Sequence, residues 1–165
     1  MSASSQPQVS PSTMTPTDAQ GARDFVTMMV ADQLFGIPVL AVQDVLGPQR
    51  ITRIPLAPPE VAGALNLRGR IVTAIDMRCR LGLPARQSTI GSMSIVVDKV
   101  GELYSLVVDN VGEVLRLPAD AYERTPPTLD AHWREMADGI YRLDGKLMVV
   151  LDVDRLLDIR RADAA

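Results

Sequence analysis

The sequence predicts an all-β protein in which two small five-stranded barrels pack side by side. Its roughly ten short apolar segments, separated by evenly spaced turn residues, are typical of strands in such a fold, and few stretches favour a helix. Two blocks of sequence recur in the same order, which indicates that the second barrel is a copy of the first. Hydrophobic residues make up 47% of the 165 residues and aromatic residues only 4%, so aliphatic side chains must fill the core.

The repeat is clearest around one hairpin. Residues 63–76 align without a gap with residues 139–152, and four positions carry the same residue type: Gly63 and Gly139, Leu67 and Leu143, Gly69 and Gly145, Asp76 and Asp152. A second block, residues 34–46, aligns in the same way with residues 103–115. Chance similarity between generic strands is the alternative explanation of these matches.

The first barrel is expected to span mainly residues 23–84. Residues 1–22 are rich in Ser, Thr, Pro and Gln and have no apolar periodicity, so we expect a disordered tail there. Pro38 suits the start of a short helical turn at residues 39–42. The consecutive Pro58 and Pro59 exclude regular structure around them, because they remove backbone donors. Strands are predicted at residues 25–30, 34–37, 43–46 and 51–54.

Residues 61–78 form the stretch around which the rest of the chain is organised. Arg68 and Gly69 separate two apolar runs, and the glycine supplies the positive φ that a two-residue hairpin needs. Arg68 is therefore expected at a solvated tip, where it could face only water or could meet a partner. The strand at residues 71–75 leads to Asp76, which is expected to cap a helical segment at residues 77–83.

The second barrel is expected to span mainly residues 90–159, after a polar bridge at residues 85–92. Its second hairpin turns at Asp144-Gly145, a strong turn signal. Residues 118–130 are predicted to be irregular, and residues 131–138 could be a helical turn or a loop. Asp152 precedes a terminal helical turn, so it and Asp76 are better explained as caps than as a catalytic carboxylate pair. The other expected elements are strands at residues 93–97, 103–108 and 113–117, a terminal turn at 153–159 and a frayed end at 160–165.

Charge and residue counts disfavour several functions. The net charge of −3 and the pI of about 5.1 argue against nucleic-acid binding, and the arginines at 68, 70, 78 and 80 have no interleaved aromatics to stack on bases. A mobility shift at modest salt would reverse this interpretation. No apolar run could span a bilayer, and the N-terminus does not resemble a signal peptide.

An enzyme is the other functional class to consider. Cys79 is the only cysteine and His132 the only histidine, which excludes an internal disulfide and disfavours histidine metal sites and a Ser-His-Asp triad. Cys79 as a nucleophile is the sharper alternative, but His132 lies far away in the sequence. Measured turnover or a bound cofactor would favour an enzyme.

With Asn66-Leu67-Arg68-Gly69 at its centre, the chain resembles the CheW-like family of bacterial chemotaxis coupling proteins. The resemblance covers about residues 24–159. It is carried by that hairpin together with Gly63, Ile71-Val72, Ile75-Asp76 and Arg78, and by residues 35–37, 42–45, 51–54 and 107–111.

The resemblance implies a non-enzymatic adaptor, without cofactor or metal, whose two five-stranded barrels are of the SH3-like kind. Its expected partners are the regulatory domain of the histidine kinase CheA and the cytoplasmic tip of methyl-accepting chemoreceptors. No nucleic acid and no direct membrane insertion are expected, and the implied location is the cytoplasm, with recruitment to membrane-associated receptor arrays. The alternative within the family is an adaptor of a non-flagellar chemosensory system, such as one that controls twitching motility.

The resemblance also implies a receptor-binding groove between the barrels. Carried over position by position, this groove would use Val42, Asp44, Gly63, Asn66, Arg68, Val111 and Val114. The repeat makes Val42 equivalent to Val111 and Val45 equivalent to Val114, and for these valines core packing is the other interpretation. No kinase-contact residue is implied, although an apolar barrel end is expected to meet a similar barrel in the kinase. Thr73, Asp44 and Pro38 depart from the usual family residues, which leaves open which receptor or kinase is matched.

Overall fold

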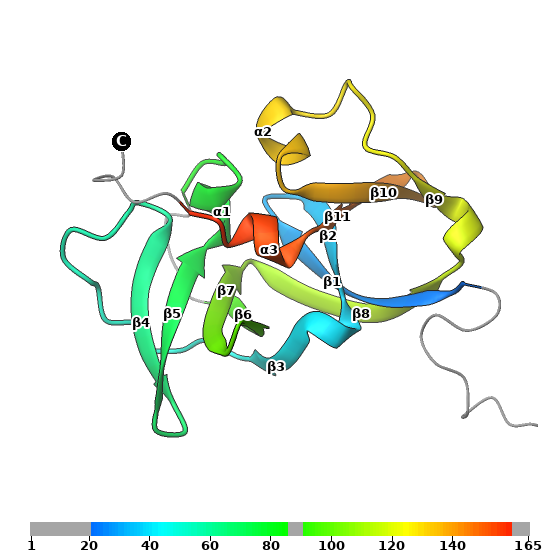
Figure 1. Cartoon of the computed structure of the whole chain (residues 1–165). Helices are drawn as coiled ribbons and strands as arrows, with labels where there is room; N and C mark the ends of the chain where they lie inside the picture. The colour runs from blue at the N-terminus through cyan, green and yellow to red at the C-terminus, as the bar shows by residue number, and fades with distance from the viewer. Residues whose placement is uncertain (1–20, 86–90, 160–165) are drawn as a thin grey trace, which may run out of the picture.

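The computed structural model describes residues 21–85 and 91–159, which form two β-sheets with a few short helices (Figure 1). One sheet has six strands in the order β8-β1-β2-β11-β10-β9, and the other has five in the order β3-β6-β7-β5-β4. The prediction that the chain is mostly β is confirmed. The strands are β1 (Arg23–Val30), β2 (Gln33–Pro38), β3 (Val42–Leu46), β4 (Val61–Leu67), β5 (Arg70–Asp76), β6 (Met93–Lys99), β7 (Glu102–Val108), β8 (Asn110–Leu117), β9 (Tyr122–Glu123), β10 (Ala137–Leu143) and β11 (Lys146–Leu151).

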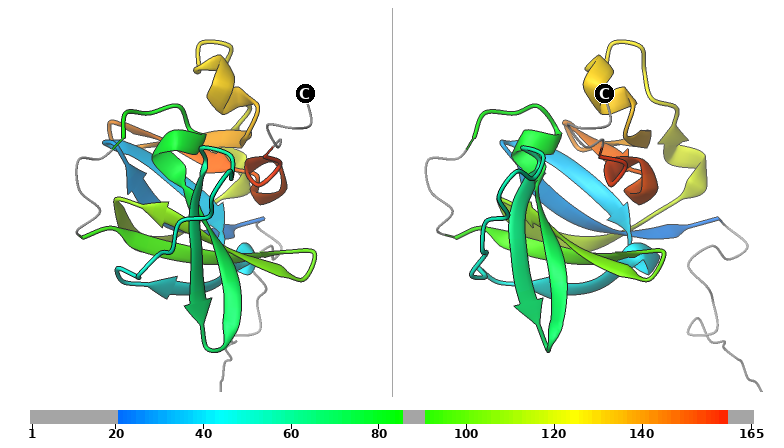
Figure 2. Two further views of the ribbon diagram at one scale, coloured as in Figure 1. Left: turned by 90° about the vertical axis from the view of Figure 1, so that its left-hand side faces the viewer. Right: turned by 60° about the vertical axis from the view of Figure 1, so that its left-hand side comes forward.

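Each sheet takes strands from both halves of the chain. β1 and β2 lie in one sheet with β8, β9, β10 and β11, whereas β3, β4 and β5 lie in the other sheet with β6 and β7 (Figure 2). Residues 23–84 thus supply three of the five strands of one sheet and residues 90–159 four of the six strands of the other, so neither half builds a sheet alone. The cause is the two parallel pairs, β2 with β11 and β5 with β7, because the last strand of each half crosses to the first strands of the other. The sixth strand, β9, lies in a stretch that was predicted to be irregular.

The two sheets nevertheless share one pairing pattern. The parallel pair of β5 and β7 places Thr73 opposite Tyr104, and the parallel pair of β11 and β2 places the repeat equivalents Val149 and Phe35 opposite each other. Register shifts also recur at equivalent places. In the hairpins they lie at Val61–Gly63 and Ala137–Gly139. In the edge strands they lie at Val42–Asp44 of β3 and between Val111 and Val114 of β8.

Local turn and cap predictions are confirmed. Arg68 has a φ of 53° and Gly69 a φ of 85°, the two positive angles of a tight hairpin turn. The Asp76 carboxylate accepts a hydrogen bond from the Cys79 amide at 3.2 Å and so caps α1 (Met77–Arg80). Asp152 caps α3 (Val153–Leu156) in the same way, through the Arg155 amide at 3.2 Å.

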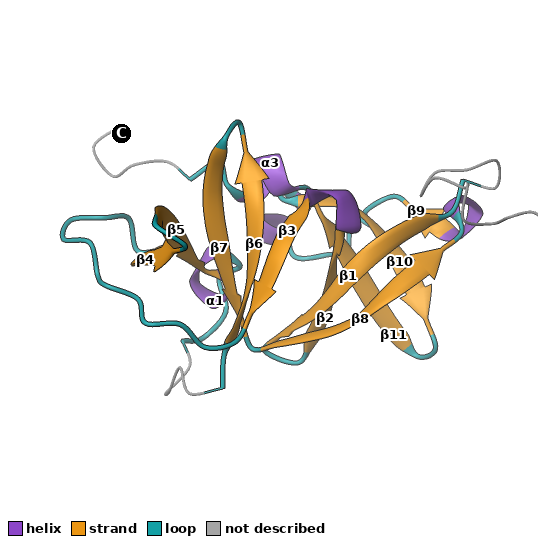
Figure 3. Cartoon of the chain, turned by 90° about the horizontal axis from the view of Figure 1, so that it is seen from below, coloured by secondary structure: helices purple, strands orange, loops and turns teal. Residues whose placement is uncertain are grey.

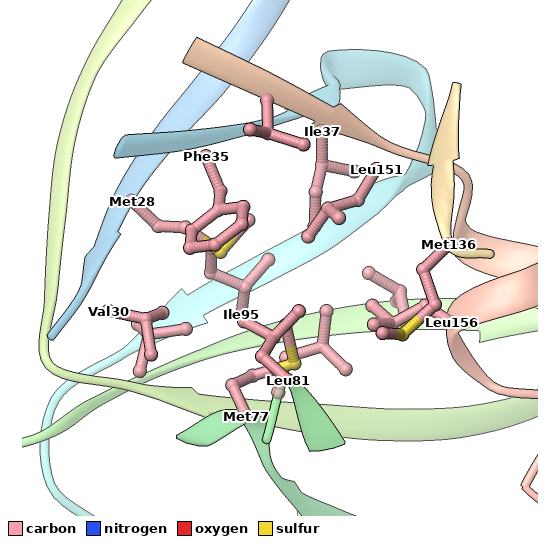
Figure 4. Packing of buried hydrophobic residues seen from close by; sticks show 14 of the residues in the cluster. Met28, Val30, Phe35, Ile37, Met77, Leu81, Ile95, Met136, Leu151 and Leu156 are labelled. Atoms are coloured by element: carbon pink, nitrogen blue, oxygen red, sulfur yellow. The ribbon is translucent and has the colours of Figure 1, made fainter. Parts of the chain in front are cut away.

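A central apolar cluster joins the two sheets. Met28 and Phe35 enter it from the six-stranded sheet, Ile95 from the five-stranded sheet, and Met77 and Leu156 from the two capped helices (Figure 4). Burial of an aliphatic side chain of this size stabilises the fold by about 1.5–3 kcal/mol, so the seam between the sheets is a major source of stability. Two smaller clusters fill the sheets themselves, one around Phe25 and Tyr141 and one around Leu65 and Val72.

Other local differences concern loops. In residues 51–54 only Thr52 pairs, with Ala64 of β4, because the segment crosses the edge of the sheet without running along it. The ambiguous residues 131–138 contain α2 (Ala131–Arg134) and the start of β10, while 3-10 turns η2 (Val39–Ala41) and η3 (Ala119–Ala121) precede β3 and β9. The predictions for residues 1–20, 86–90 and 160–165 lie outside the described residues.

Candidate functional site

Three of the predicted site residues meet where the β4–β5 hairpin reaches β3. The Arg68 Nη2 atom donates to the Asp44 Oδ2 atom at 3.0 Å, and the two side chains are 75% and 29% exposed. The Asn66 side-chain oxygen accepts a hydrogen bond from the Gly69 amide at 3.0 Å, which fixes the turn that carries Arg68. The guanidinium is therefore held in place, and its other donors remain turned to solvent.

Gly63 has a different role from the one that the sequence suggested. It is buried in β4, and its φ of +150° lies in a region that L-residues rarely adopt. A Cβ atom there would stand 2.2 Å from the Thr52 carbonyl oxygen, so the glycine allows the preceding loop to cross β4. Gly139 occupies the equivalent place under Tyr122 of β9, where a Cβ atom would also stand 2.2 Å from the ring. The structure assigns Gly63 to close packing of the backbone.

The three predicted valines lie on the edge strands of the two sheets. Val42 on β3 and Val111 on β8 are half-buried and pack against the central cluster, so core packing explains part of their surface. Val114 on β8 is 58% exposed. The structure thus brings Asp44, Asn66 and Arg68 into one group, whereas Val111 and Val114 belong to the edge of the other sheet.

Val45 was not among the predicted site residues, although it lies next to one of them. It lies on β3 with its side chain 39% exposed, beside the Asp44 that holds Arg68. The repeat alignment of residues 34–46 with 103–115 pairs Val45 with Val114, and this was the signal that could have identified it. We refer below to the exposed parts of these two equivalent strands as the edge-strand surface, defined by Val42, Asp44, Val45, Val111 and Val114.

Two other arginines near the hairpin, Arg78 and Arg80, make contacts that stabilise the fold. The Arg78 guanidinium donates to both carboxylate oxygens of Asp109, at 3.0 and 2.6 Å, and Asp109 also accepts from the Ala31 amide at 2.8 Å. The hydrogen bond with Asp109 is the main reason that the pKa of Arg78 is raised above its usual value. Arg80 donates to the Leu156 carbonyl at 2.7 Å and so closes the end of α3. These contacts give Arg78 and Arg80 structural roles, whereas Arg68 stays largely exposed.

No group of three or more His, Cys, Asp or Glu side chains in residues 21–85 and 91–159 is placed to hold a metal ion. No helix in that part of the chain is both long enough and apolar enough to cross a membrane. His132 uses its Nε2 atom at the Arg80 carbonyl, 2.7 Å away, and Trp133 donates to the Leu81 carbonyl at 2.7 Å, so α2 fastens the end of α1.

Cys79 is expected to react slowly as a nucleophile. Burial, together with the nearby Asp76 and Glu60 carboxylates, raises the pKa of its thiol and so disfavours the reactive thiolate. At about pH 8 we expect iodoacetamide to modify the folded protein several-fold more slowly than the urea-unfolded chain, with the rate rising as the pH increases. Mass spectrometry over time measures this difference. Equal rates would contradict this expectation, and a faster rate in the folded chain would show that Cys79 is an activated thiol.

Known proteins are similar in sequence to most of this chain. The CheW-like domain family matches residues 24–161. Chemotaxis protein CheW of Rhizobium meliloti (strain 1021) is 28% identical over 145 residues, which cover 88% of this chain and 94% of that protein. Chemotaxis protein CheW of Helicobacter pylori is 26% identical over 140 residues, covering 85% of this chain and 84% of that protein.

Among solved structures, the scaffolding protein TtCheW from Thermoanaerobacter tengcongensis is similar with a TM-score of 0.75 and 30% identity. The match covers 84% of this chain and 94% of that chain. The family match spans both sheets and the hairpin that carries Arg68. The chain therefore belongs to the CheW-like domain family.

Proposed function

We propose that the edge-strand surface and the Arg68 hairpin bind the cytoplasmic tip of a methyl-accepting chemoreceptor. As a member of its family, the protein is a non-enzymatic scaffold of chemotaxis signalling that couples receptors to the kinase CheA. Its partners would be the receptor tip and the regulatory domain of CheA, and its place would be the cytoplasm, at membrane-associated receptor arrays. A scaffold of this kind acts by binding alone.

One observation carries the receptor proposal: Arg68 stands exposed and paired with Asp44 of β3, the strand that also carries the exposed Val45. Asp44 and the Asn66 turn restrict the guanidinium, so less conformational entropy is lost when it binds. Val45 and Val114 supply apolar contacts for the stripe of a helical partner, and the guanidinium could donate paired hydrogen bonds to a carboxylate or carbonyl.

We also propose that the two sheets are SH3-like barrels derived by internal duplication. The support is their shared pattern: exchanging the two halves converts the order β8-β1-β2-β11-β10 into β3-β6-β7-β5-β4. The matching registers and the equivalent caps at Asp76 and Asp152 agree with this origin.

For the kinase we propose the end of the five-stranded sheet where two hairpin tips meet. Arg70 donates to the Gly101 carbonyl at 3.4 Å and links these tips, and the neighbouring Ile71 and Val100 are 71% and 92% exposed. Such an apolar barrel end suits contact with a similar barrel. A pull-down with the CheA regulatory domain, with and without Ile71→Ser, tests this assignment separately from receptor binding.

Arg68→Glu tests the receptor surface. We expect the affinity for a receptor-tip fragment to fall by about tenfold or more, because the substitution removes the donors and places a second carboxylate beside Asp44. The thermal midpoint should shift little, since exposed ion pairs contribute only about 0–1 kcal/mol. Isothermal titration and a thermal melt of the same sample measure both quantities.

Arg70→Glu is the matched control, with the same charge change two residues along the hairpin. It should leave receptor binding close to that of the unchanged protein. If Arg68→Glu binds the receptor tip as tightly as the unchanged chain does, Arg68 is not part of the site.

A further inference from the structure

The apolar clusters inside the two sheets occupy equivalent positions of the repeat but differ in size. In Figure 3 the strands of the five-stranded sheet stand on the left and those of the six-stranded sheet on the right, and each sheet has its own cluster. The hairpin residues of the two clusters pair in the same register, and all of them are buried. The smaller side chain always lies in the five-stranded sheet, which has Leu65 for Tyr141, Val72 for Met148 and Ala74 for Val150.

The largest difference lies at Ser94 on β6. Ser94 pairs with Val107 of β7. Phe25 of β1 pairs with Pro38 of β2, and the repeat aligns Pro38 with Val107. Because their partners are equivalent, Ser94 stands where the other sheet carries Phe25. The Phe25 ring is fully buried and meets the Tyr141 ring edge to face, with 5.4 Å between the centroids. Neither ring has an aromatic counterpart in the five-stranded sheet.

A cavity of about 450 Å³ lies beside these small side chains, at the end of the five-stranded sheet away from the Arg68 tip. Ser94 and its partner Val107 both line it, and Ile51 and Ala62 add apolar surface. Well-packed protein interiors leave few voids larger than a water molecule, and an apolar cavity of about 150 Å³ is already large enough to hold benzene. The cavity therefore has room for one or two aromatic rings.

The charged side chains in the wall of the cavity already have partners within the protein. Arg78 directs its Nε and Nη2 atoms to Asp109 and its Nη1 atom to the Pro84 carbonyl, at 2.6 to 3.0 Å. Asp76 accepts a hydrogen bond from the Cys79 amide at 3.2 Å. A charged ligand would have to break such contacts or remain unpaired, so the wall suits a neutral molecule.

We propose that this cavity binds a small, neutral aromatic molecule that carries a hydroxyl group. Its ring occupies, beside Ser94, the place that Phe25 fills in the other sheet. The ring packs against the apolar side chains of the wall, and its hydroxyl group forms a hydrogen bond with Ser94. The proposal is independent of receptor and kinase binding, because none of the residues proposed for those contacts lines the cavity.

Titration of the full, isotope-labelled chain with 2-naphthol, followed by nuclear magnetic resonance, tests the proposal. We expect saturable amide shifts centred on Ser94 and Val107, with a dissociation constant of about 0.1–1 mM. The thermal midpoint should rise with ligand concentration, because the ligand binds only the folded chain. Decahydro-2-naphthol, which is saturated and thicker, should bind at least tenfold more weakly. The absence of saturable shifts with 2-naphthol, or equal binding of the saturated compound, overturns the proposal.

Two substitutions place the ligand in the cavity. Ser94→Phe fills it with the side chain that the other sheet carries, and Ala62→Leu narrows it from the opposite hairpin strand, so each should weaken 2-naphthol binding by at least tenfold. Ala121→Leu is the matched control on the exposed turn η3 and should bind like the unchanged protein. If Ser94→Phe fails to fold, Ala62→Leu alone decides. Full binding by a folded Ala62→Leu chain, or an equal loss with Ala121→Leu, overturns the proposal.

Discussion

Replacing Gly63 with alanine is expected to lower the free energy of unfolding by about 3 kcal/mol or more. The new Cβ atom would stand 2.2 Å from the Thr52 carbonyl oxygen, and this oxygen cannot move away because it accepts the Ala64 amide at 2.8 Å. The φ of +150° adds a backbone conformation that alanine resists. For a chain of this size the thermal midpoint should fall by about 10 °C, measured by circular dichroism.

Two other glycines separate the causes of this loss. Gly69→Ala tests positive φ alone, since its φ is +85° and nothing lies within 4 Å of the added atom, so a loss of about 1 kcal/mol is expected. Gly47→Ala meets neither condition and should have little effect. If Gly63→Ala melts with the unchanged protein yet loses receptor binding, Gly63 belongs to the binding surface after all.

Neither half of the chain is expected to fold alone. Without residues 91–165, β1 and β2 lose β8 and β11, and β5 loses β7, so both sheets are left with open edges and an exposed central cluster. The separated fragments 1–85 and 91–165 should therefore be unfolded or aggregated. When they are co-expressed or refolded together, they should recover the spectrum of the whole chain, because all pairings other than the connecting segment can reform.

Nuclear magnetic resonance of each fragment and of the refolded mixture measures this outcome. Dispersed amide signals from either fragment as a monomer would contradict it. A chain divided between Ala121 and Tyr122 is a useful comparison, since the cut separates β9, β10 and β11 from the rest and leaves the five-stranded sheet with all of its strands.

Features that depend on a few neighbouring residues could be predicted from the sequence. The Arg68-Gly69 hairpin and the aspartate caps before α1 and α3 are set by local turn chemistry, and all appear in the structure. The exposure of Arg68 follows from its place at a hairpin tip. Its partner Asp44 was placed in the same site by family resemblance, and the ion pair between them accounts for their proximity.

Long-range pairing could not be predicted in the same way. An apolar strand such as β2 carries no local signal of which strand it will pair with, so the sequence did not indicate the parallel partner β11 and the halves were assigned to separate barrels. The packing role of Gly63 depends on the Thr52 carbonyl that crosses it, a contact made in three dimensions. Likewise the contacts of Arg78 and Arg80 could not be predicted, because Asp109 and the Leu156 carbonyl are distant from them in the sequence.

The exchange of strands between the halves bears on how such a chain could arise. A half-length precursor with these pairings would satisfy its sheet edges only as a symmetric homodimer, each subunit lending its first two strands to the other. Fusion of two such genes would turn that dimer into a monomer, after which each copy of the hairpin was free to diverge. The tip that carries Arg68 in one repeat carries Asp144 in the other, so a chain of that origin would present unlike groups where the dimer had presented two identical ones.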